Sequence, residues 1–166
     1  MVVGSAQALL VQQGTITQTD GAAGDYFGVS VALSSDGNTA IVGAYEDFLG
    51  PGSASIFIRS GITWTKQQTI TQTDGAADDA FGRSVALSSD GNTAIVGAYF
   101  DDVGGFTNQG SASIFTRSGT TWTQQQTITQ TGGAADDYFG YSVALSSDGN
   151  TAIVGAVQDD VGGFTD

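Results

Sequence analysis

The sequence of 166 residues contains no cysteine, no histidine, one proline and only four basic side chains. Without cysteine the chain forms neither disulfides nor thiolate metal sites. Without histidine it lacks the commonest zinc ligand and the usual general base near neutral pH. The net charge of -13 disfavours binding to nucleic-acid phosphates and anionic membrane surfaces. No apolar run approaches the ~20 residues of a membrane-spanning helix, and the start, Met1-Val2-Val3-Gly4, predicts no signal peptide.

The sequence is instead rich in internal repeats. The fifteen letters SVALSSDGNTAIVGA occur at Ser30–Ala44, Ser84–Ala98 and Ser142–Ala156, and Phe-Gly plus one variable residue precedes each copy. The offsets between copies are 54 and 58 residues. A Gly-Ser-Ala motif and a QQTITQT motif also recur, the latter in a degenerate form at Gln13–Thr19. Such repetition at a fixed period indicates a repeat architecture.

Each repeat predicts four short strands, because short apolar stretches with strand periodicity alternate with turn residues. Asp-Gly between two apolar runs is a strong hairpin signal. Four antiparallel strands in 54 to 58 residues are typical of a β-propeller blade, so we predict an all-β propeller. A β-solenoid or a β-sandwich is the alternative. In the second repeat the expected strands are Phe81–Ser88, Thr93–Ala98, Ser111–Arg117 and Trp122–Thr129.

The Phe-Gly and Gly-Ala motifs resemble the FG-GAP repeat, which builds the propeller heads of integrin α chains and of many bacterial extracellular proteins. The resemblance implies an extracellular or cell-surface location. Some integrin blades carry a calcium loop between the first two strands. Here that place holds tight turns with a single Asp, such as Ser88–Asn92, while calcium needs six to eight oxygen ligands, so we do not expect that site. The motifs are Phe27-Gly28 with Gly43-Ala44, Phe81-Gly82 with Gly97-Ala98, and Phe139-Gly140 with Gly155-Ala156.

The strand order predicts that the chain begins and ends within a blade. Residues 1–26 supply strands three and four, expected at Gly4–Val11 and Gln13–Thr19, and residues 139–166 supply strands one and two. Residues 27–80 and 81–138 are complete blades, which gives three blade equivalents. Propellers typically have four to eight blades, so we expect the ring to be completed by a homo-oligomer. A dimer with six blades is favoured over a trimer with nine. The alternative that the sequence is an excerpt of a longer repetitive chain stays open, as does the origin of the near-identical repeats by recent duplication or by engineering.

Most acidic side chains are expected on one face of the propeller. The loops from strand four to one and from strand two to three lie on that face, and only Asp36, Asp90 and Asp148 fall on the other. No cofactor is required, but paired aspartates within a blade are candidate calcium ligands. The alternative is that these are solvated loop residues that cap backbone N–H groups. The candidates are Asp78, Asp79, Asp101 and Asp102 in one set and Asp136, Asp137, Asp159 and Asp160 in the other.

Three groups of larger side chains carry further expectations. The tyrosines beside the Phe-Gly motif are expected to pack between blades, the tryptophans at the outer edge of a blade, and the glutamines on an exposed outer strand. These residues are Tyr26, Tyr138 and Tyr141; Trp64 and Trp122; and Gln67, Gln68 and Gln124–Gln126.

We expect no catalysis, because nucleophilic catalysis needs a base and neither His nor Cys is present. The leading hypothesis is a non-catalytic binding or scaffold module that assembles into a ring and binds a protein or a glycan. The alternatives are a purely structural self-assembling propeller and a calcium-dependent adhesion module. A glycosidase with paired Asp is least favoured, because the pairs recur in successive repeats while an active site usually breaks such symmetry.

Overall fold

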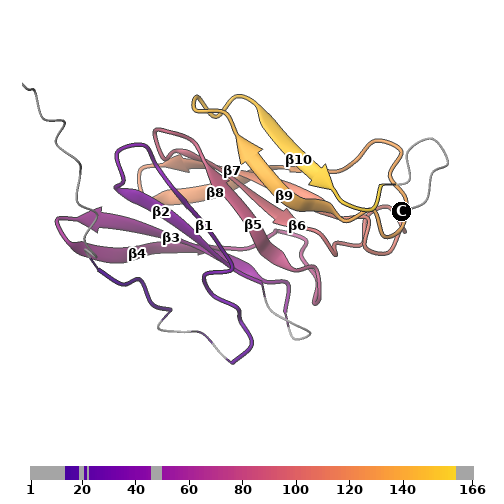
Figure 1. Cartoon of the computed structure of the whole chain (residues 1–166), viewed down its shortest axis with the longest axis horizontal. Coiled ribbons are helices and arrows are strands. Elements are labelled where there is room, and N and C mark those ends of the chain that lie inside the picture. Colours follow the sequence, from indigo (N-terminus) through magenta and orange to yellow (C-terminus); the bar gives the residue numbers. More distant parts are fainter. Residues whose placement is uncertain (1–13, 19–20, 22, 46–49, 160–166) are drawn as a thin grey trace, which may run out of the picture.

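The structure, a computed structural model, describes residues 14–18, 21, 23–45 and 50–159. Every regular element in these ranges is a β-strand, as Figure 1 shows. None of the described residues belongs to a helix, so no helix long enough to cross a bilayer is found among them. The strands are β1 (Ser30–Leu33), β2 (Thr39–Ala44), β3 (Ser53–Ser60), β4 (Thr63–Ile70), β5 (Phe81–Leu87), β6 (Thr93–Ala98), β7 (Ser111–Ser118), β8 (Thr121–Ile128), β9 (Phe139–Leu145) and β10 (Ala152–Ala156).

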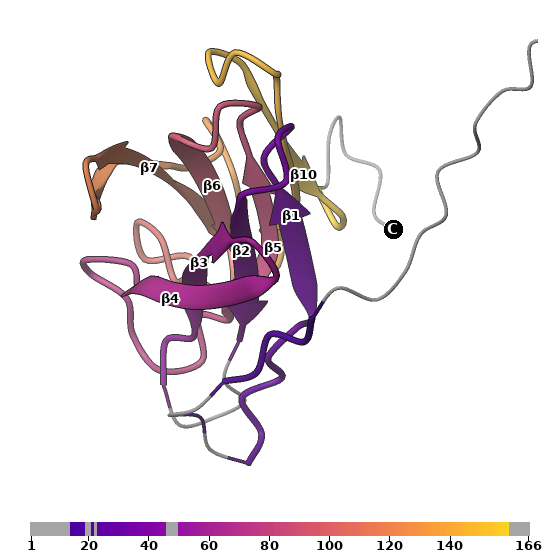
Figure 2. The ribbon, with the colours of Figure 1, turned by 90° about the vertical axis from the view of Figure 1, so that its left-hand side faces the viewer.

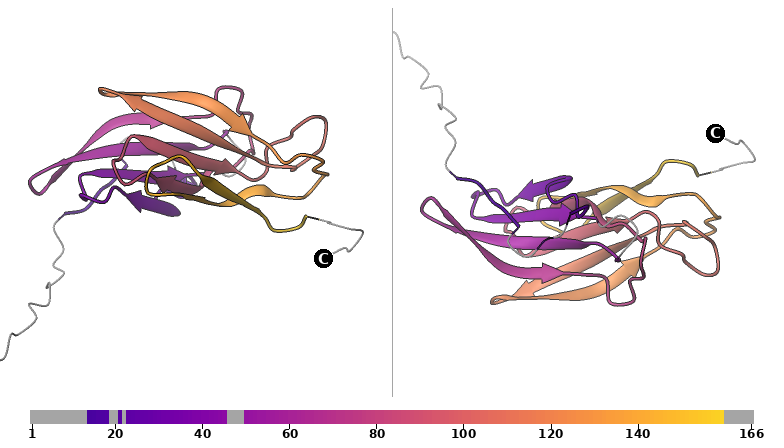
Figure 3. Two further views of the ribbon diagram at one scale, coloured as in Figure 1. Left: turned by 90° about the horizontal axis from the view of Figure 1, so that it is seen from above. Right: turned by 90° about the horizontal axis from the view of Figure 1, so that it is seen from below.

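The strands form two four-stranded antiparallel sheets and one hairpin. We call β1–β4 blade 1, β5–β8 blade 2 and the β9–β10 hairpin half-blade 3; within each, neighbours in sequence pair in the sheet. Figure 2 shows the strong twist of blade 1, in which β4 lies across the direction of β1. In Figure 3, β1 and β9–β10 lie on one side of the molecule and β8 on the opposite side. The predicted all-β fold and the strand order within each blade are confirmed.

The first turn of each blade has the chemistry that the sequence predicts. Asp90 Oδ1 accepts hydrogen bonds from the Ser88 hydroxyl at 2.6 Å and from the Asn92 backbone N–H at 3.0 Å. Gly91 between them has a φ of 66°, a left-handed conformation that suits glycine. These hydrogen bonds, the one from Ser88 above all, lower the pKa of Asp90. The same motif in blade 1 lowers the pKa of Asp36 to about 2.

Blades 1 and 2 share one apolar core. Residues of β2, β3 and β4 that point toward blade 2 pack against residues of β5 to β8 that point back, and Phe81 is fully buried between them. Burial of this surface is the main force that holds neighbouring blades together. The buried members of the core are Ile41, Ala54, Ile56 and Ile70 from blade 1, and Phe81, Ala94, Val96, Ala98, Phe115 and Trp122 from blade 2.

The innermost strands also touch through their backbones. The Ser30 hydroxyl donates a hydrogen bond to the Gly82 carbonyl oxygen at 2.8 Å. One repeat later, the Ser84 hydroxyl donates to the Gly140 carbonyl oxygen at the same distance. A Cβ atom added at Gly43 would collide with the Gly82 carbonyl, so this approach requires glycine. A blade therefore donates through its strand-one serine to the Phe-Gly carbonyl of the next blade.

The turns at the other end of the innermost strands repeat this directional pairing. The Ser35 backbone N–H donates to the Ser89 carbonyl oxygen at 2.9 Å, and the Ser89 N–H donates to the Ser147 carbonyl oxygen at 2.9 Å. Each blade thus donates forward along the chain at two separate points.

The fourth strands refine one sequence expectation and correct another. Trp122 lies on the outermost strand of its blade, as expected, but its side chain is only 3% exposed and belongs to the core between the blades. Its indole N–H donates to Gln67 Oε1 at 3.1 Å, and its backbone N–H donates to Gln68 Oε1 at 2.8 Å. Gln67 and Gln68 are therefore half-buried interface residues, while Gln125 and Gln126 are exposed as predicted. The twist of the sheet brings strand four of one blade onto strand four of the next, which a linear pattern does not reveal.

Candidate functional site

Two loops of blade 2 meet at one end of the molecule. They are the connection from β4 to β5, which contains Asp78 and Asp79, and the loop from β6 to β7, which contains Asp101 and Asp102. The Phe100 backbone N–H donates a hydrogen bond to the Asp79 carbonyl oxygen at 3.2 Å and ties the loops together. The structure therefore brings the first predicted set of aspartates into one neighbourhood.

The carboxylates of the β6–β7 loop already have partners from the protein. Asp101 Oδ2 accepts hydrogen bonds from the Ser111 hydroxyl at 2.5 Å and from the Gln72 side-chain amide at 2.7 Å. Asp102 Oδ1 accepts one from the Asn108 backbone N–H at 2.8 Å. Asp102 thus caps a backbone N–H group, as the alternative interpretation describes, while Asp101 is held by two side chains.

Asp79 is the most perturbed acid in the part of the chain that the structure describes. Its side chain is 4% exposed, and Oδ2 accepts a hydrogen bond from the Ala76 backbone N–H at 2.6 Å. Burial raises the pKa of Asp79 to about 6, and the hydrogen bond from Ala76 opposes this rise. The negative charges of Asp101, Asp102 and Asp74 raise the pKa further. Asp79 is therefore a group that gains a proton under mildly acidic conditions.

The second predicted set lies where blade 2 meets half-blade 3. The Gln158 backbone N–H donates to the Asp137 carbonyl oxygen at 3.3 Å, which brings Asp159 to this junction. Asp137 is buried, and Asp159 is half-buried. Asp160 lies outside the described residues. The backbone contact repeats the one between Phe100 and Asp79 of blade 2.

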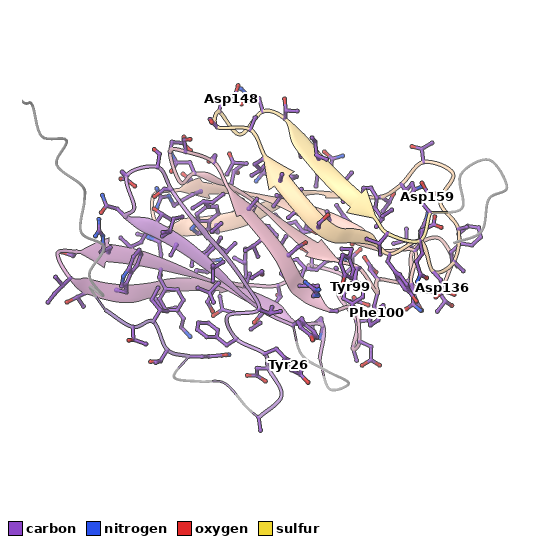
Figure 4. All side chains as sticks on the ribbon, viewed as in Figure 1. Tyr26, Tyr99, Phe100, Asp136, Asp148 and Asp159 are labelled. Carbon is purple, nitrogen blue, oxygen red and sulfur yellow. The ribbon has the colours of Figure 1, made fainter. Side chains whose placement is uncertain are left out.

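Asp136 reaches a different partner from its neighbour in sequence. Its Oδ1 accepts a hydrogen bond from the Asn108 side-chain amide at 2.8 Å, so it links the β8–β9 connection to the β6–β7 loop. Asp78, at the same place in the earlier connection, is exposed like Asp136. Figure 4 shows Asp136 and Asp159 at one end of the molecule and Asp148, in the β9–β10 turn, away from them.

Across the described ranges, the aspartates do not gather into a metal centre. No group of three or more His, Cys, Asp or Glu residues in them is arranged to hold a metal ion. Most of the candidate carboxylates accept hydrogen bonds from backbone or side-chain donors instead. Calcium binding by these residues stays a prediction.

Aromatic side chains join blade 2 to half-blade 3 beside the acidic loops. The ring centroids of Tyr99 and Tyr141 are 5.4 Å apart, and those of Phe100 and Tyr138 are 5.5 Å apart. The Arg83 guanidinium lies 4.7 Å from the Tyr141 ring centroid and donates a hydrogen bond to its hydroxyl at 3.2 Å. The predicted packing of Tyr138 and Tyr141 between blades is confirmed. The sequence analysis missed Tyr99, Phe100 and Arg83 as their partners.

Tyr26 behaves differently from the other two tyrosines. It is 52% exposed and stacks on Tyr45 of the same blade, with centroids 4.9 Å apart. The expectation that it packs between blades is wrong for the chain as described. No blade precedes blade 1 among the described residues, so none of these residues takes the place beside Tyr26 that Phe100 and Tyr99 take beside Tyr138.

Blade 1 has an open apolar surface on the side away from blade 2, which we call the leading face. Val31 is 68% exposed and Leu33 is 59% exposed, whereas Val85 and Leu87 at the same repeat positions are half-buried under blade 1. The face borders a groove of about 390 Å³. Its walls include Ile16, Phe27, Val31, Leu33, Val42 and Trp64.

Residues 14–18 lie against the leading face where strand four of a preceding blade belongs. Ile16 packs with Trp64 and Phe57, and Ile70 packs in the same way with Trp122 and Phe115 one repeat later. The expected strand at Gln13–Thr19 is nevertheless not formed over its described part, 14–18. Its expected mate, Gly4–Val11, lies outside the described residues.

Half-blade 3 is open on its opposite side, which we call the trailing face. Ile153 is 72% exposed there, while Ile41 and Ile95 at the same repeat position are fully buried. Ser142, which corresponds to Ser30 and Ser84, is exposed as well. The described part of the chain therefore ends in a face that matches the buried side of blades 1 and 2.

Solved structures show similarity to this fold at low sequence identity. Hydrazine synthase of Kuenenia stuttgartiensis aligns with a TM-score of 0.51 and 19% identity, over 86% of this chain and 31% of that one. The GH74 enzyme of Niastella koreensis aligns with a TM-score of 0.44 and 18% identity, over 75% of this chain and 21% of that one. The chain thus spans less than a third of either protein, and the likeness to the first supports the fold alone. No curated protein is significantly similar in sequence.

The sequence itself matches a family of repeats. The profile described as the FG-GAP repeat matches residues 10–57, 64–115 and 122–165, which together make up most of the chain. The second match runs from strand four of blade 1 to strand three of blade 2, in agreement with the observed strand order. With its four-stranded antiparallel blades and these three matches, the chain belongs to the FG-GAP repeat family of β-propellers.

Proposed function

We propose that the chain is a non-catalytic propeller module that serves as a binding or scaffold platform, and that further copies of the chain complete its ring. The observation that carries the proposal is the presence of two complementary open faces. The leading face of blade 1 carries the same kinds of residue as the surface of blade 2 that packs on blade 1. The trailing face of half-blade 3 carries the same kinds of residue as the surface of blade 1 that packs on blade 2.

Head-to-tail joining of such faces closes into a ring when the rotation between copies suits. Two copies supply six blades, which lies within the usual range for propellers, and three copies supply nine. We favour the ring of two copies. A purely structural role for that ring is the alternative, and the near-identity of the repeats suits it equally well.

The absence of catalysis is supported by the residue types and their contacts. The chain contains neither histidine nor cysteine. In the described part, Asp101 and Asp102 accept hydrogen bonds that hold the β6–β7 loop in place, so they are not poised as a pair of acid and nucleophile.

The acidic loops at one end of the propeller are the surface that we assign to ligands. Their negative charge suits a basic protein segment, and the neighbouring tyrosines suit a glycan ring. FG-GAP repeats are typical of extracellular proteins, so we place the module outside the cell or at its surface. Calcium shared between aspartates is an optional part of this proposal, in which case the module is a calcium-dependent adhesion unit.

Native mass measurement tests the proposal directly. The chain has a mass of 16.8 kDa, and we expect a species of two chains or, as the alternative, three. The measurement is repeated with added calcium and with a chelator. A mass that depends on calcium supports the adhesion version, and an unchanged multiple supports the plain scaffold. A chain that stays monomeric at all concentrations in both conditions contradicts the proposal.

A further inference from the structure

Resting on the proposed function, we infer that Ile153 of one copy docks in the groove of the leading face of a second copy, beside that copy's Ile16 and Trp64. The interface between blades 1 and 2 shows how this works. Ile41 is fully buried there in one cluster with Ile70, Phe81 and Trp122. One repeat earlier, the residues in the last three places are Ile16, Phe27 and Trp64, and they surround an open groove.

The missing member of the open groove is the isoleucine of a preceding blade. Ile153 is that residue in the third repeat, and it is 72% exposed on the trailing face. Transfer of such a side chain from water into an apolar groove strengthens the complex by roughly one to two orders of magnitude in affinity at full burial. The docking surface between two copies therefore has the same shape as the interface between blades 1 and 2 within one chain.

Backbone contacts fix the direction of this docking. Within the chain, Ser30 and Ser84 donate forward to the Phe-Gly carbonyl of the next blade. Ser142 is the next serine in this series, and Gly28 of a second copy carries the carbonyl that the first Phe-Gly motif presents. The turns extend the same series, from Ser147 of one copy to Ser35 of the next. The interface joins two different faces and is heterologous.

A buried atom in the β8–β9 connection, which leads into half-blade 3, supports the docking independently. Gln130 Oε1 is buried and has no hydrogen-bond partner among the described residues. At the same place in the preceding repeat, Gln72 Oε1 accepts from the Ser111 hydroxyl of strand three of the next blade, at 3.4 Å. A buried unpaired acceptor is costly, so it marks the position of a missing donor. By the same pattern, the donor to Gln130 is expected on strand three of the blade that β9 and β10 begin.

The decisive experiment blocks each face separately and then mixes the two variants. Ile153→Asp places a charge on the trailing face, and Leu33→Asp places one on the leading face. Both side chains are largely exposed, so each variant should fold with an unfolding midpoint close to that of the unchanged chain. We expect each variant alone to associate roughly tenfold or more weakly, because burial of an unpaired charge is costly. Phe106→Asp is the matched control, since Phe106 is 47% exposed in the β6–β7 loop of blade 2, which belongs to neither face.

A mixture of the two blocked variants should form a species of exactly two chains. The intact trailing face of the Leu33→Asp chain docks on the intact leading face of the Ile153→Asp chain, and no further copy adds. If the mixture stays monomeric, or if Phe106→Asp weakens association as much as Ile153→Asp, the inference is overturned. The milder change Ile153→Thr should also weaken association, but less than Ile153→Asp does. If neither change at Ile153 weakens association, the inference is overturned as well.

These outcomes separate the inference from the proposed function. If the unchanged chain assembles while Ile153→Asp assembles equally well, the ring proposal stands and the docking inference fails. If the unchanged chain is monomeric at every concentration, the ring proposal fails and the docking inference fails with it.

Discussion

Removal of a serine hydroxyl group should lower stability where the hydroxyl is buried between two blades, as in Ser84, and not where it faces solvent, as in Ser142. Ser84 and Ser142 occupy the same place in an identical stretch of fifteen residues. The Ser84 hydroxyl is buried and donates to the Gly140 carbonyl oxygen at 2.8 Å, whereas Ser142 is exposed on the trailing face. The sequence context is thus constant, and only the neighbouring blade differs.

The expected losses of stability follow from these environments. Ser84→Ala leaves the carbonyl of Gly140 without its donor in a buried place, which costs about 1–2 kcal/mol. For a domain of this size, that loss lowers the Tm by about 2–8 °C. Ser142→Ala removes a hydroxyl group that faces solvent, so its effect on a single chain should stay within about 0.5 kcal/mol.

Thermal and denaturant unfolding of the two variants measure this difference. Both changes are introduced together with Ile153→Asp, which keeps the trailing face free of a second copy. The loss in Ser84→Ala should then be independent of protein concentration. Equal losses in the two variants, or a Ser84→Ala chain as stable as its parent, would refute the reasoning that this hydrogen bond couples the blades.

Three further perturbations test other contacts. Trp122→Phe removes the indole donor to Gln67 Oε1, and we expect guanidinium unfolding to show a loss of about 1–3 kcal/mol; an unchanged midpoint would count against a structural role for this contact. Gly97→Ala places a Cβ against the carbonyl of Gly140 and should lower the Tm by an amount that corresponds to about 1–3 kcal/mol, which a neutral result would contradict. The pKa of Asp79 is raised to about 6 in the folded chain from an ordinary value of 3.8, so folding is favoured as the pH falls from 7 through 6 toward 4. Asp79→Asn should abolish that gain, and parallel stability curves for the two chains between pH 7 and pH 5 would show that the burial of Asp79 has no such effect.

The fold was largely predictable from the sequence because the same local signals recur in each repeat. Ser88, Asp90 and Asn92 form the expected turn, and the strands on each side of it begin and end close to the predicted residues. Repeated turn chemistry and alternating apolar residues fix both strand length and strand order. The antiparallel blades and the family resemblance followed from these signals alone.

The contacts between blades were harder to predict, because they depend on which neighbour a residue meets. Tyr26 and Tyr138 both precede Phe-Gly, but within the described residues Tyr138 alone has a blade before it that supplies aromatic partners. Trp64 and Trp122 share one sequence context, and Trp122 meets Gln67 and Gln68 of the preceding fourth strand, whereas Gly14 stands beside Trp64 in the place of Gln68. Such differences depend on the neighbour that each repeat meets, so the repeated letters do not encode them.

The identity of the three SVALSSDGNTAIVGA copies has a consequence for how the chain reaches its native state. During folding, β9–β10 presents the same side chains as β5–β6, apart from Tyr141 in the place of Arg83, and competes with it for the same partners in blade 1. Repeat proteins of high self-similarity are prone to such misassembly, which appears as slow refolding phases and exchanged segments. Two features favour the correct arrangement over its shifted counterpart. The segments that connect successive motifs differ in length, since the motif copies are offset by 54 and then by 58 residues, and the side chains outside the motif differ between repeats. Slow synthesis from the N-terminus, which lets blade 1 and blade 2 pair before half-blade 3 emerges, should therefore give a higher yield of native chain than refolding from denaturant.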